Sequence, residues 1–216
     1  TEKIFIKGYF KKKLKKLLKK NVKREILFSC VVPKAFKKIK NIFRDKKFKF
    51  FEIKQFDIKQ LIKINIKNLS KLGSDRIVNS IEGKKFKNCL IIDFGTATTF
   101  DIVNKKQYLG GIIAPGVSLS LKTLISKATL IPNLKLKKIN QVLGKNTISA
   151  VRSGFYWGYI GLVESIIHKI NKQTKKKYKI VITGGFSQLF SNSLKIKAVI
   201  DKDITMKGLQ KIAKTI

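Results

Sequence analysis

The spacing of apolar residues predicts alternating helices and strands from the start of the chain. The segment FKKKLKKLLKKN (10–21) repeats its apolar positions at helical intervals between lysines, which predicts an amphipathic helix. We interpret this helix as facing a core rather than a membrane surface. The run EILFSCVVP (25–33) is continuously apolar and ends at a proline, as a buried strand does. Alternating strand and helix signals are typical of the α/β class.

The rest of the chain repeats this alternation. LIIDFGTATTFDIV (90–103) is an apolar run, a polar turn and a second apolar run. A helix is expected to start near Val117, after a proline and a glycine, and the longest helical pattern covers 146–174. YKIVITGG (178–185) and LKIKAVID (194–201) have the composition of strands.

The pattern divides the chain into two α/β lobes. The border falls where a basic turn separates the helix that ends near Gly83 from the strand of 90–103. We therefore expect one lobe over residues 1–85 and another over 86–216. At 216 residues the chain is long enough to bury a sizeable core.

The net charge of +37 does not by itself identify a partner of the protein. A charge of this sign can indicate a nucleic-acid or anionic membrane partner. Only four of the 49 basic residues are arginines, however, and the lysines are spread along the whole chain. We interpret them as a solvated surface that reflects a compositional bias. The hydrophobic content of 44% is that of a globular protein rather than a disordered one.

Two cysteines indicate a reducing compartment. Cys30 and Cys89 each lie within an apolar run, where a thiol behaves as a small buried hydrophobe. Their spacing predicts neither a disulfide framework nor a zinc site, so a cytoplasmic protein is expected. No apolar stretch approaches the roughly 20 residues that span a bilayer. The chain begins at Thr1 rather than at a methionine, so we expect that its natural start is missing.

The turn within 90–103 carries the first candidate chemistry. Asp93 ends the strand, Gly95 permits a tight turn, and hydroxyls of Thr96, Thr98 and Thr99 follow. Backbone N–H groups and hydroxyls of such a turn can contact a phosphate, and a carboxylate beside it can hold a cation. A β-hairpin with a polar, glycine-containing turn would have the same pattern.

Two other glycine-containing segments are candidates. GSDR (73–76) places a glycine before a helix, where N–H groups and the helix dipole favour an anion. Asp75 can accept a proton from a hydroxyl and Arg76 can bind a carboxylate, although ordinary helix capping would also explain the motif. Gly184 and Gly185 could let an adenine ring approach the backbone, but glycine pairs are common at helix starts.

The order of these segments resembles the type III pantothenate kinases. The resemblance rests on LGSDRIVNSI, IIDFGTATTFDIV, YLGGIIAPGVSLSLKTLISKATLIP, GKNT, RSGFYWGYIGLVE and ITGG, in this order and over essentially the whole chain. It implies two ribonuclease H-like lobes of the actin-like ATPase superfamily. It also implies ATP-dependent phosphorylation of pantothenate to 4'-phosphopantothenate, the first step towards coenzyme A, in a homodimer.

The resemblance implies a role for each matching residue. Asp75 would be the general base, and the pantothenate contacts would be Gly73, Ser74, Asp75, Arg76 and Thr147. Thr96 would contact ATP phosphate, with Gly184 and Gly185 near the adenosine. Asp93 would bind a monovalent cation, K⁺ or NH₄⁺, and Mg²⁺ would accompany ATP. Ser74 stands where the family usually has alanine.

Two departures from the family pattern are present. The family starts with a strand and a turn of the form Asp-x-Gly-Asn-Thr that grips the ATP phosphates, and no segment here matches it. SCVVP (29–33), which resembles a later strand of the family, already lies near the start. We therefore expect the first lobe to lack its initial strands, and this form to have little or no kinase activity. Ile66 and Leu69 also replace a usual tyrosine and proline.

Two functions of other classes remain as alternatives. One is a non-catalytic member of the same family that acts as a regulator, of the kind called Bvg accessory factors. The other is a basic nucleic-acid-binding protein. Retention of Asp75, Asp93 and Thr147 favours the kinase, because a protein that only binds has no chemical need for this set.

Overall fold

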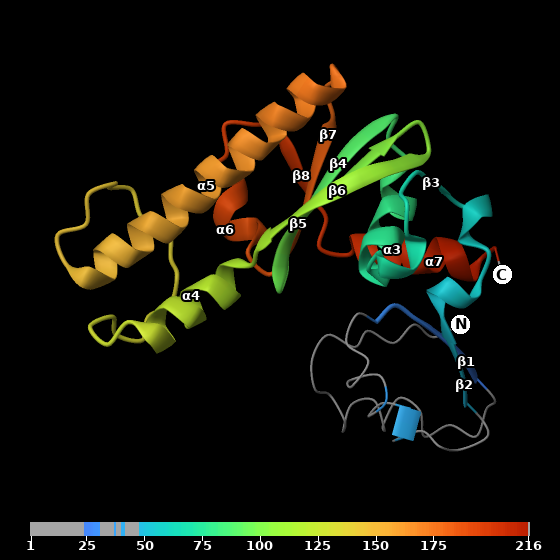
Figure 1. Cartoon of the computed structure of the whole chain (residues 1–216), viewed down its shortest axis with the longest axis horizontal. Coiled ribbons are helices and arrows are strands. Elements are labelled where there is room, and N and C mark those ends of the chain that lie inside the picture. The colour runs from blue at the N-terminus through green and yellow to red at the C-terminus, as the bar shows by residue number, and fades with distance from the viewer. Residues whose placement is uncertain (1–23, 31–36, 38–39, 42–47, 216) are drawn as a thin grey trace.

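A six-stranded mixed sheet with helices on both faces forms the body of the molecule (Figure 1). The computed structural model describes residues 24–30, 37, 40–41 and 48–215, so the amphipathic helix expected within 10–21 lies outside the described residues. The sheet has the order β3-β6-β5-β4-β7-β8, and β1 and β2 form a separate parallel pair. The strands are β1 (Arg24–Phe28), β2 (Phe48–Glu52), β3 (Lys63–Ile64), β4 (Asn88–Phe94), β5 (Ala97–Asn104), β6 (Gln107–Pro115), β7 (Lys179–Gly184) and β8 (Ala198–Ile200).

The helices predicted after Gly73, near Val117 and over 146–174 are present, with small shifts at their ends. The α-helices are α3 (Ser74–Gly83), α4 (Val117–Lys127), α5 (Thr147–Thr174), α6 (Ser187–Ser191) and α7 (Ile204–Ala213), and the short 3₁₀ helices are η1 (Ile53–Gln55), η2 (Ile58–Gln60) and η3 (Leu69–Lys71). The expected helix start near Val117 is confirmed. Asn146 is the N-cap of α5, since its side chain accepts a hydrogen bond from Ser149 N.

Each face of the sheet covers its own apolar core. Leu90, Ile92 and Phe94 of β4 pack towards α5 and α6, with the aromatic residues Tyr156 and Phe190. Cys89 and Ile91 point to the other face and pack with residues of α3 and α7. Successive side chains of a strand alternate between faces, so β4 is buried on both sides, as its unbroken apolar run predicts.

The strand predicted over 194–201 is shorter than expected. β8 contains only three residues, because pairing with β7 is limited to Ile180 through Ile182. Leu194, at the start of the predicted strand, is instead buried in the core beneath α5. Its hydrophobicity reflects packing rather than strand pairing.

Parts of the predicted first lobe contact the main sheet. β3 pairs in parallel with β6, and Ile77, Val78 and Ile81 of α3 share a core with Ile91 of β4. The division between residues 85 and 86 stays a prediction. In the part of the chain that the structure describes, no helix is long and apolar enough to cross a membrane.

Candidate active site

The first turn of α3 is fixed from the end of β2. Gly73 precedes the helix and gives it no side-chain cap. The Ser74 hydroxyl instead donates to Glu52 Oε1, and Ser74 is 3% exposed. The serine found in place of the family's alanine therefore uses its side chain to hold the helix start against β2, which leaves its backbone for other contacts.

Arg76 reaches from α3 to a fully buried carboxylate on the sheet. Its Nε donates to Asp101 Oδ1 at 2.8 Å, and its Nη2 lies 2.7 Å from the same oxygen. The Tyr108 hydroxyl donates to Oδ1 as well, at 2.9 Å. The Asp101 side chain is 0% exposed and that of Arg76 is 11% exposed, so the ion pair is almost entirely withdrawn from water.

Burial and the ion pair act in opposite directions on Asp101. Burial raises the pKa of Asp101 to about 6, and the nearby charge of Asp75 also raises it, whereas Arg76 and Tyr108 lower it. The pKa of the Arg76 guanidinium is raised: burial opposes this shift, and the charge of Asp101 outweighs it. The two shifts agree that Arg76 remains charged at neutral pH while Asp101 titrates slightly below it.

Asp75 lies in the first turn of α3 and is partly exposed. One of its oxygens, Oδ1, accepts a hydrogen bond from Arg76 N at 2.8 Å. This contact directs the carboxylate along the start of the helix, beside Arg76. Asp75 and Arg76, which are adjacent in the sequence, thus both lie in the first turn of α3.

Asp93 belongs to the same face of the sheet as Asp101. In the strand register Asp93 lies opposite Thr99 on β5 and opposite Thr183 on β7. Directly opposed residues share a face, and Asp101 follows Thr99 by two residues, so it shares this face too. The carboxyl ends of β4 and β7 therefore present a carboxylate between two threonines, on the side of the sheet that α3 covers.

Gly184 makes room for the Asp93 carboxylate. Its φ is +89°, a conformation that favours glycine. A Cβ at this position would lie 2.5 Å from Asp93 Oδ1 and 2.6 Å from the Phe94 carbonyl oxygen. Gly185 N donates to that same carbonyl at 3.1 Å. The glycine pair thus joins the ends of β4 and β7, and it brings Gly184 and Gly185 next to Asp93.

The turn after Asp93 packs beneath the start of α4. Thr96 is exposed in this turn, which a bond from Gly95 N to Ala97 O closes at 3.1 Å. A Cβ on Gly116, the N-cap residue of α4, would overlap the Thr96 carbonyl oxygen. The expected phosphate contact by Thr98 is wrong, because Thr98 is 0% exposed and its register places it on the α5 side of the sheet.

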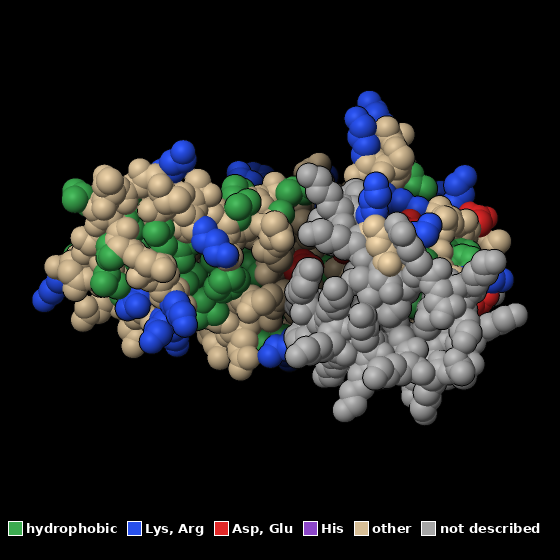
Figure 2. Space-filling view, turned by 90° about the horizontal axis from the view of Figure 1, so that it is seen from below, with side chains coloured by type: hydrophobic (Ala, Val, Ile, Leu, Met, Phe, Trp, Pro, Cys, Tyr) green, Lys and Arg blue, Asp and Glu red, His purple; other side chains and the backbone are tan. Residues whose placement is uncertain are grey.

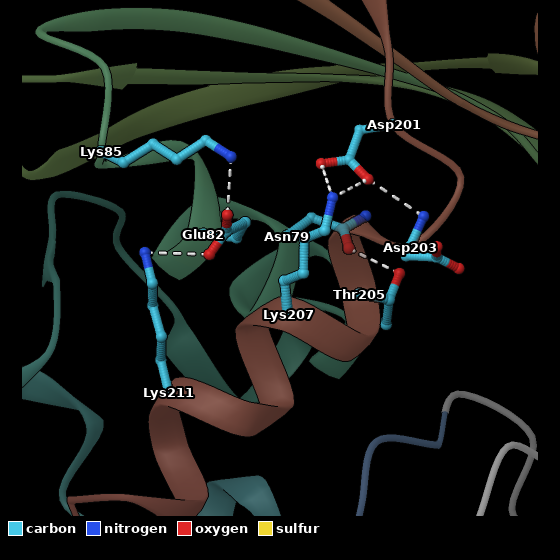
Figure 3. A network of polar contacts seen from close by, with 8 residues as sticks. All are labelled: Asn79, Glu82, Lys85, Asp201, Asp203, Thr205, Lys207 and Lys211. Carbon is cyan, nitrogen blue, oxygen red and sulfur yellow. Dashed lines mark hydrogen bonds and ion pairs between the residues drawn. The ribbon is translucent and has the colours of Figure 1, made fainter.

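Polar contacts hold α7 against α3 (Figure 3). Glu82 accepts from Lys85 Nζ at 2.7 Å, and its other oxygen lies 2.9 Å from Lys211 Nζ. Thr205 Oγ1 donates to Asn79 Oδ1 at 2.7 Å. A Cβ on Gly208 would overlap the Val78 carbonyl oxygen, so the two helices cross in close contact. These contacts fix the helix that carries Asp75 and Arg76.

Thr147 is not brought to the other predicted site residues within one chain. It is exposed at the first position of α5. In Figure 1, α5 begins at the end of the molecule farthest from α3, next to the far end of α4. The remaining predicted residues gather near one face of the sheet.

Sequence reasoning missed several residues around this face. Tyr108, Gly111 and Thr183 lie in segments that carry the resemblance but were given no role, and Glu52 lies in no motif. Asp101 lies in the segment IIDFGTATTFDIV but had no assigned role. The signal that could have found it is the two-residue alternation after the hairpin turn, which places Asp101 on the face of Asp93.

Comparison with known proteins gives the family of the chain. A family model described as type III pantothenate kinase matches residues 6–169. The chain is 54% identical over 185 residues to the type III pantothenate kinase of Pelagibacter ubique, covering 85% of this chain and 74% of the relative. It is 40% identical over 192 residues to that of Sulfurihydrogenibium sp., covering 86% of this chain and 75% of the relative.

Solved structures give the fold. A conserved putative Baf family transcriptional activator from Campylobacter jejuni has a TM-score of 0.61 at 24% identity, covering 94% of this chain and 87% of that one. The Alp12 filament structure has a TM-score of 0.51 at 16% identity, covering 94% and 72%. These likenesses show the fold, and the expected α/β class is confirmed. The family model and the curated relatives match most of the sequence. The chain therefore belongs to the type III pantothenate kinase family.

Proposed function

We propose that this protein transfers the γ-phosphoryl group of ATP to the primary hydroxyl of pantothenate, forming 4'-phosphopantothenate and ADP. The observation that carries the proposal is the polar face at the carboxyl ends of β4 and β7, with Asp75 and Arg76 beside it, in a chain 54% identical to a type III pantothenate kinase. Phosphoryl transfer depends mainly on positioning and charge neutralisation. This face offers groups that can position the substrates and groups that can neutralise charge.

Asp75 is proposed as the general base. The pantothenate oxygen forms a bond to the γ-phosphorus, the bond to the bridging oxygen breaks, and ADP leaves with the electron pair. The hydroxyl proton passes to the Asp75 carboxylate. The hydrogen bond from Arg76 N supports this role, because it fixes one oxygen and orients the other. Gly73 and Ser74 would contact pantothenate through the backbone at the start of α3, with Arg76 beside them.

The Thr96 turn and the glycine pair are proposed to bind ATP. Thr96 is exposed in a turn that follows Asp93, and a turn of this kind offers N–H groups and a hydroxyl to phosphate. Gly185 is exposed and lies next to Gly184 at the end of β7, where a flat adenine ring could approach the backbone.

The residues around Asp93 fit a monovalent cation, K⁺ or NH₄⁺. The carboxylate lies between the strand positions of Thr99 and Thr183, and it fits there because residue 184 has no Cβ. Oxygen donors of this kind suit a hard cation. Among the described residues no group of three or more His, Cys, Asp or Glu gathers to hold a metal, so Mg²⁺ would be held chiefly by the ATP phosphates. Such cations neutralise phosphate charge.

A homodimer is proposed to complete the pantothenate site. The start of α5, which carries Thr147, is remote from α3, which carries Asp75 (Figure 1), so a second copy would have to supply Thr147. Large apolar side chains are exposed in the segment that joins α4 to α5, including Val142 at 66%, Leu143 at 84% and Leu130 at 89%. Exposed apolar groups of this size are typical of an interface. The buried thiol of Cys89 fits a reducing cytoplasm, which is the proposed location.

The deciding experiment combines binding and turnover. Isothermal titration should detect pantothenate binding to the 216-residue chain, and ADP release should depend on pantothenate if turnover occurs. Binding is the firmer measure, because it does not depend on turnover. Where turnover is measurable, Asp75→Asn should lower it by at least about a hundredfold, and in every case ATP affinity should stay unchanged. Loss of ATP binding in this variant would contradict the role of Asp75, and absence of pantothenate binding in the wild type would contradict the function.

Nucleic-acid binding is the alternative that the net charge of +37 supports. On the face drawn in Figure 2, the Lys and Arg side chains are scattered rather than gathered in one patch. A dispersed charge predicts only weak, salt-sensitive binding to DNA. Tight binding of arbitrary duplex DNA at physiological salt would favour this alternative, and binding of one DNA sequence alone would favour a regulator.

A further inference from the structure

Arg76 of the GSDR motif pairs with Asp101, a buried carboxylate that lies outside this motif. We propose that Asp101 is a positioning residue, which with Tyr108 and Gly111 fixes the Arg76 guanidinium for binding the anionic end of pantothenate. The proposal rests on the proposed function, because it concerns how that substrate is held.

The geometry fixes one side of the guanidinium and leaves the other available. Arg76 Nε and Nη2 both approach Asp101 Oδ1, at 2.8 and 2.7 Å. Within the described residues Nη1 makes no hydrogen bond, and the side chain retains 11% exposure. An arginine held by its Nε side can still offer its remaining N–H groups to a carboxylate.

Tyr108 and Gly111 both contribute to the position of this ion pair. The Tyr108 hydroxyl donates to the same Asp101 oxygen at 2.9 Å, and Tyr108 is 1% exposed. Gly111 lies directly opposite Asp101 in the sheet, and a Cβ there would overlap Arg76 Nη2. The glycine therefore leaves the space that the guanidinium fills, and any larger residue would push it out.

A carboxylate in this position has no direct contact of its own with solvent. Asp101 is 0% exposed, and its Oδ2 has no hydrogen-bond partner among the described residues. Burying a charge in this way is costly unless the charge is paired. A purely apolar residue would pack between the sheet and α3 at lower cost, so the ion pair is explained by what it does to Arg76.

A double-mutant cycle tests the proposal by pantothenate titration of the full chain. Asp101→Asn and Arg76→Ala should each weaken pantothenate binding by about tenfold or more, which is the effect of removing one charged hydrogen bond. The double variant should bind no more weakly than Arg76→Ala alone, because Asp101 acts through Arg76. ATP affinity should stay unchanged in all three. Asp203→Asn, which changes an exposed carboxylate at the start of α7, is the matched control and should bind as the wild type does.

The cycle separates positioning from general stability. Leaving Asp101 unpaired should destabilise Arg76→Ala, and adding Asp101→Asn should restore part of the lost stability while binding stays weak. If Asp101→Asn does not fold, Tyr108→Phe removes one donor only and should weaken pantothenate binding by about threefold to tenfold. Wild-type affinity in folded Asp101→Asn or Tyr108→Phe would overturn the inference while the proposed function stands. Failure of the wild type to bind pantothenate would contradict the function itself.

Discussion

The ionisation of Asp101 decides how firmly Arg76 is held. Burial raises the pKa of Asp101 to about 6, against the lowering effects of Arg76 and Tyr108, and the Asp75 charge adds to the rise. Below this pH the carboxyl gains a proton and the ion pair is lost. Pantothenate affinity should therefore fall by about threefold between pH 7.5 and 5.5, since most of the carboxyl is protonated at the lower value.

The measurement is a series of pantothenate titrations across this pH range. Asp101→Asn should give a weak affinity that does not change over the same interval. A wild-type profile as flat as that of the variant would mean that Arg76 does not depend on the charge of Asp101. ATP titrations over the same range provide the control for general pH effects.

At the residue scale, the sequence predicts chemistry better than orientation. The motifs identified Asp75, Asp93 and Gly184, and the structure places the last two in contact. The motifs did not predict that Thr98 faces the apolar core while Thr99 lies opposite Asp93. These orientations depend on the register of the hairpin. The partner of Arg76 was also hidden, since an ion pair between residues 25 positions apart has no local signal.

At the element scale, the contact of α7 with α3 stabilises the helix that carries the proposed base. Burial opposes ionisation of Glu82, but hydrogen bonds from Lys85 and Lys211 outweigh it and lower the pKa below the usual 4.5. The native carboxyl therefore stays ionised to lower pH than in the unfolded chain. This contribution to stability is present above about pH 4.5 and is lost as the pH falls through the native pKa.

Glu82→Gln tests this contact. The variant should lose about 1–2 kcal/mol of unfolding free energy at pH 7, because two hydrogen bonds to a charged group are weakened and the lysines are partly exposed. Urea denaturation at pH 7 and pH 4 measures the loss, and the difference from wild type should shrink at the lower pH. An equal difference at both pH values would contradict the electrostatic origin.

The two-residue loop between β5 and β6 holds two lysines in a conformation that other residues adopt at lower cost. Lys105 and Lys106 form the two-residue loop with φ values of 46° and 66°. Both residues adopt the left-handed conformation that Asn-Gly prefers in such turns. Lys105→Asn with Lys106→Gly should raise the unfolding free energy by about 1 kcal/mol. Urea denaturation measures the gain, and a loss of stability would show that the lysine side chains contribute more than the turn costs.

Element positions were the most predictable part of the fold. The start of α4 and the cap of α5 follow from proline, glycine and asparagine signals that act locally. The length of β8 was not predictable, because it depends on how much of β7 is available to pair. Pairing between distant segments is a property of the folded chain rather than of a local pattern.

At the scale of the whole molecule, the position of Thr147 predicts sites shared between two copies. Arg76→Ala removes one half of such a site, and Thr147→Ala removes the other. Each variant alone should bind pantothenate weakly. After the two are mixed and allowed to exchange subunits, about a quarter of all sites should be intact, because half of the dimers are mixed and each has one unaltered site.

The stoichiometry of tight pantothenate binding in the mixture measures this recovery. A mixture that binds no better than its components would contradict a shared site. Leu143→Asp provides the control, because a charge within the exposed apolar group should prevent dimer formation. With that change in both components, recovery should disappear and light scattering should report monomers.

The close packing of Gly116 on the Thr96 carbonyl has a consequence for assembly. The start of α4 and the Thr96 turn have no free space between them, so neither can shift alone. The same helix exposes Leu119 and Leu124. If two copies meet there, the interface and the ATP site are thermodynamically linked, and the linkage must be reciprocal. ATP should then lower the dissociation constant of the dimer by the same factor by which dimer formation increases the affinity for ATP.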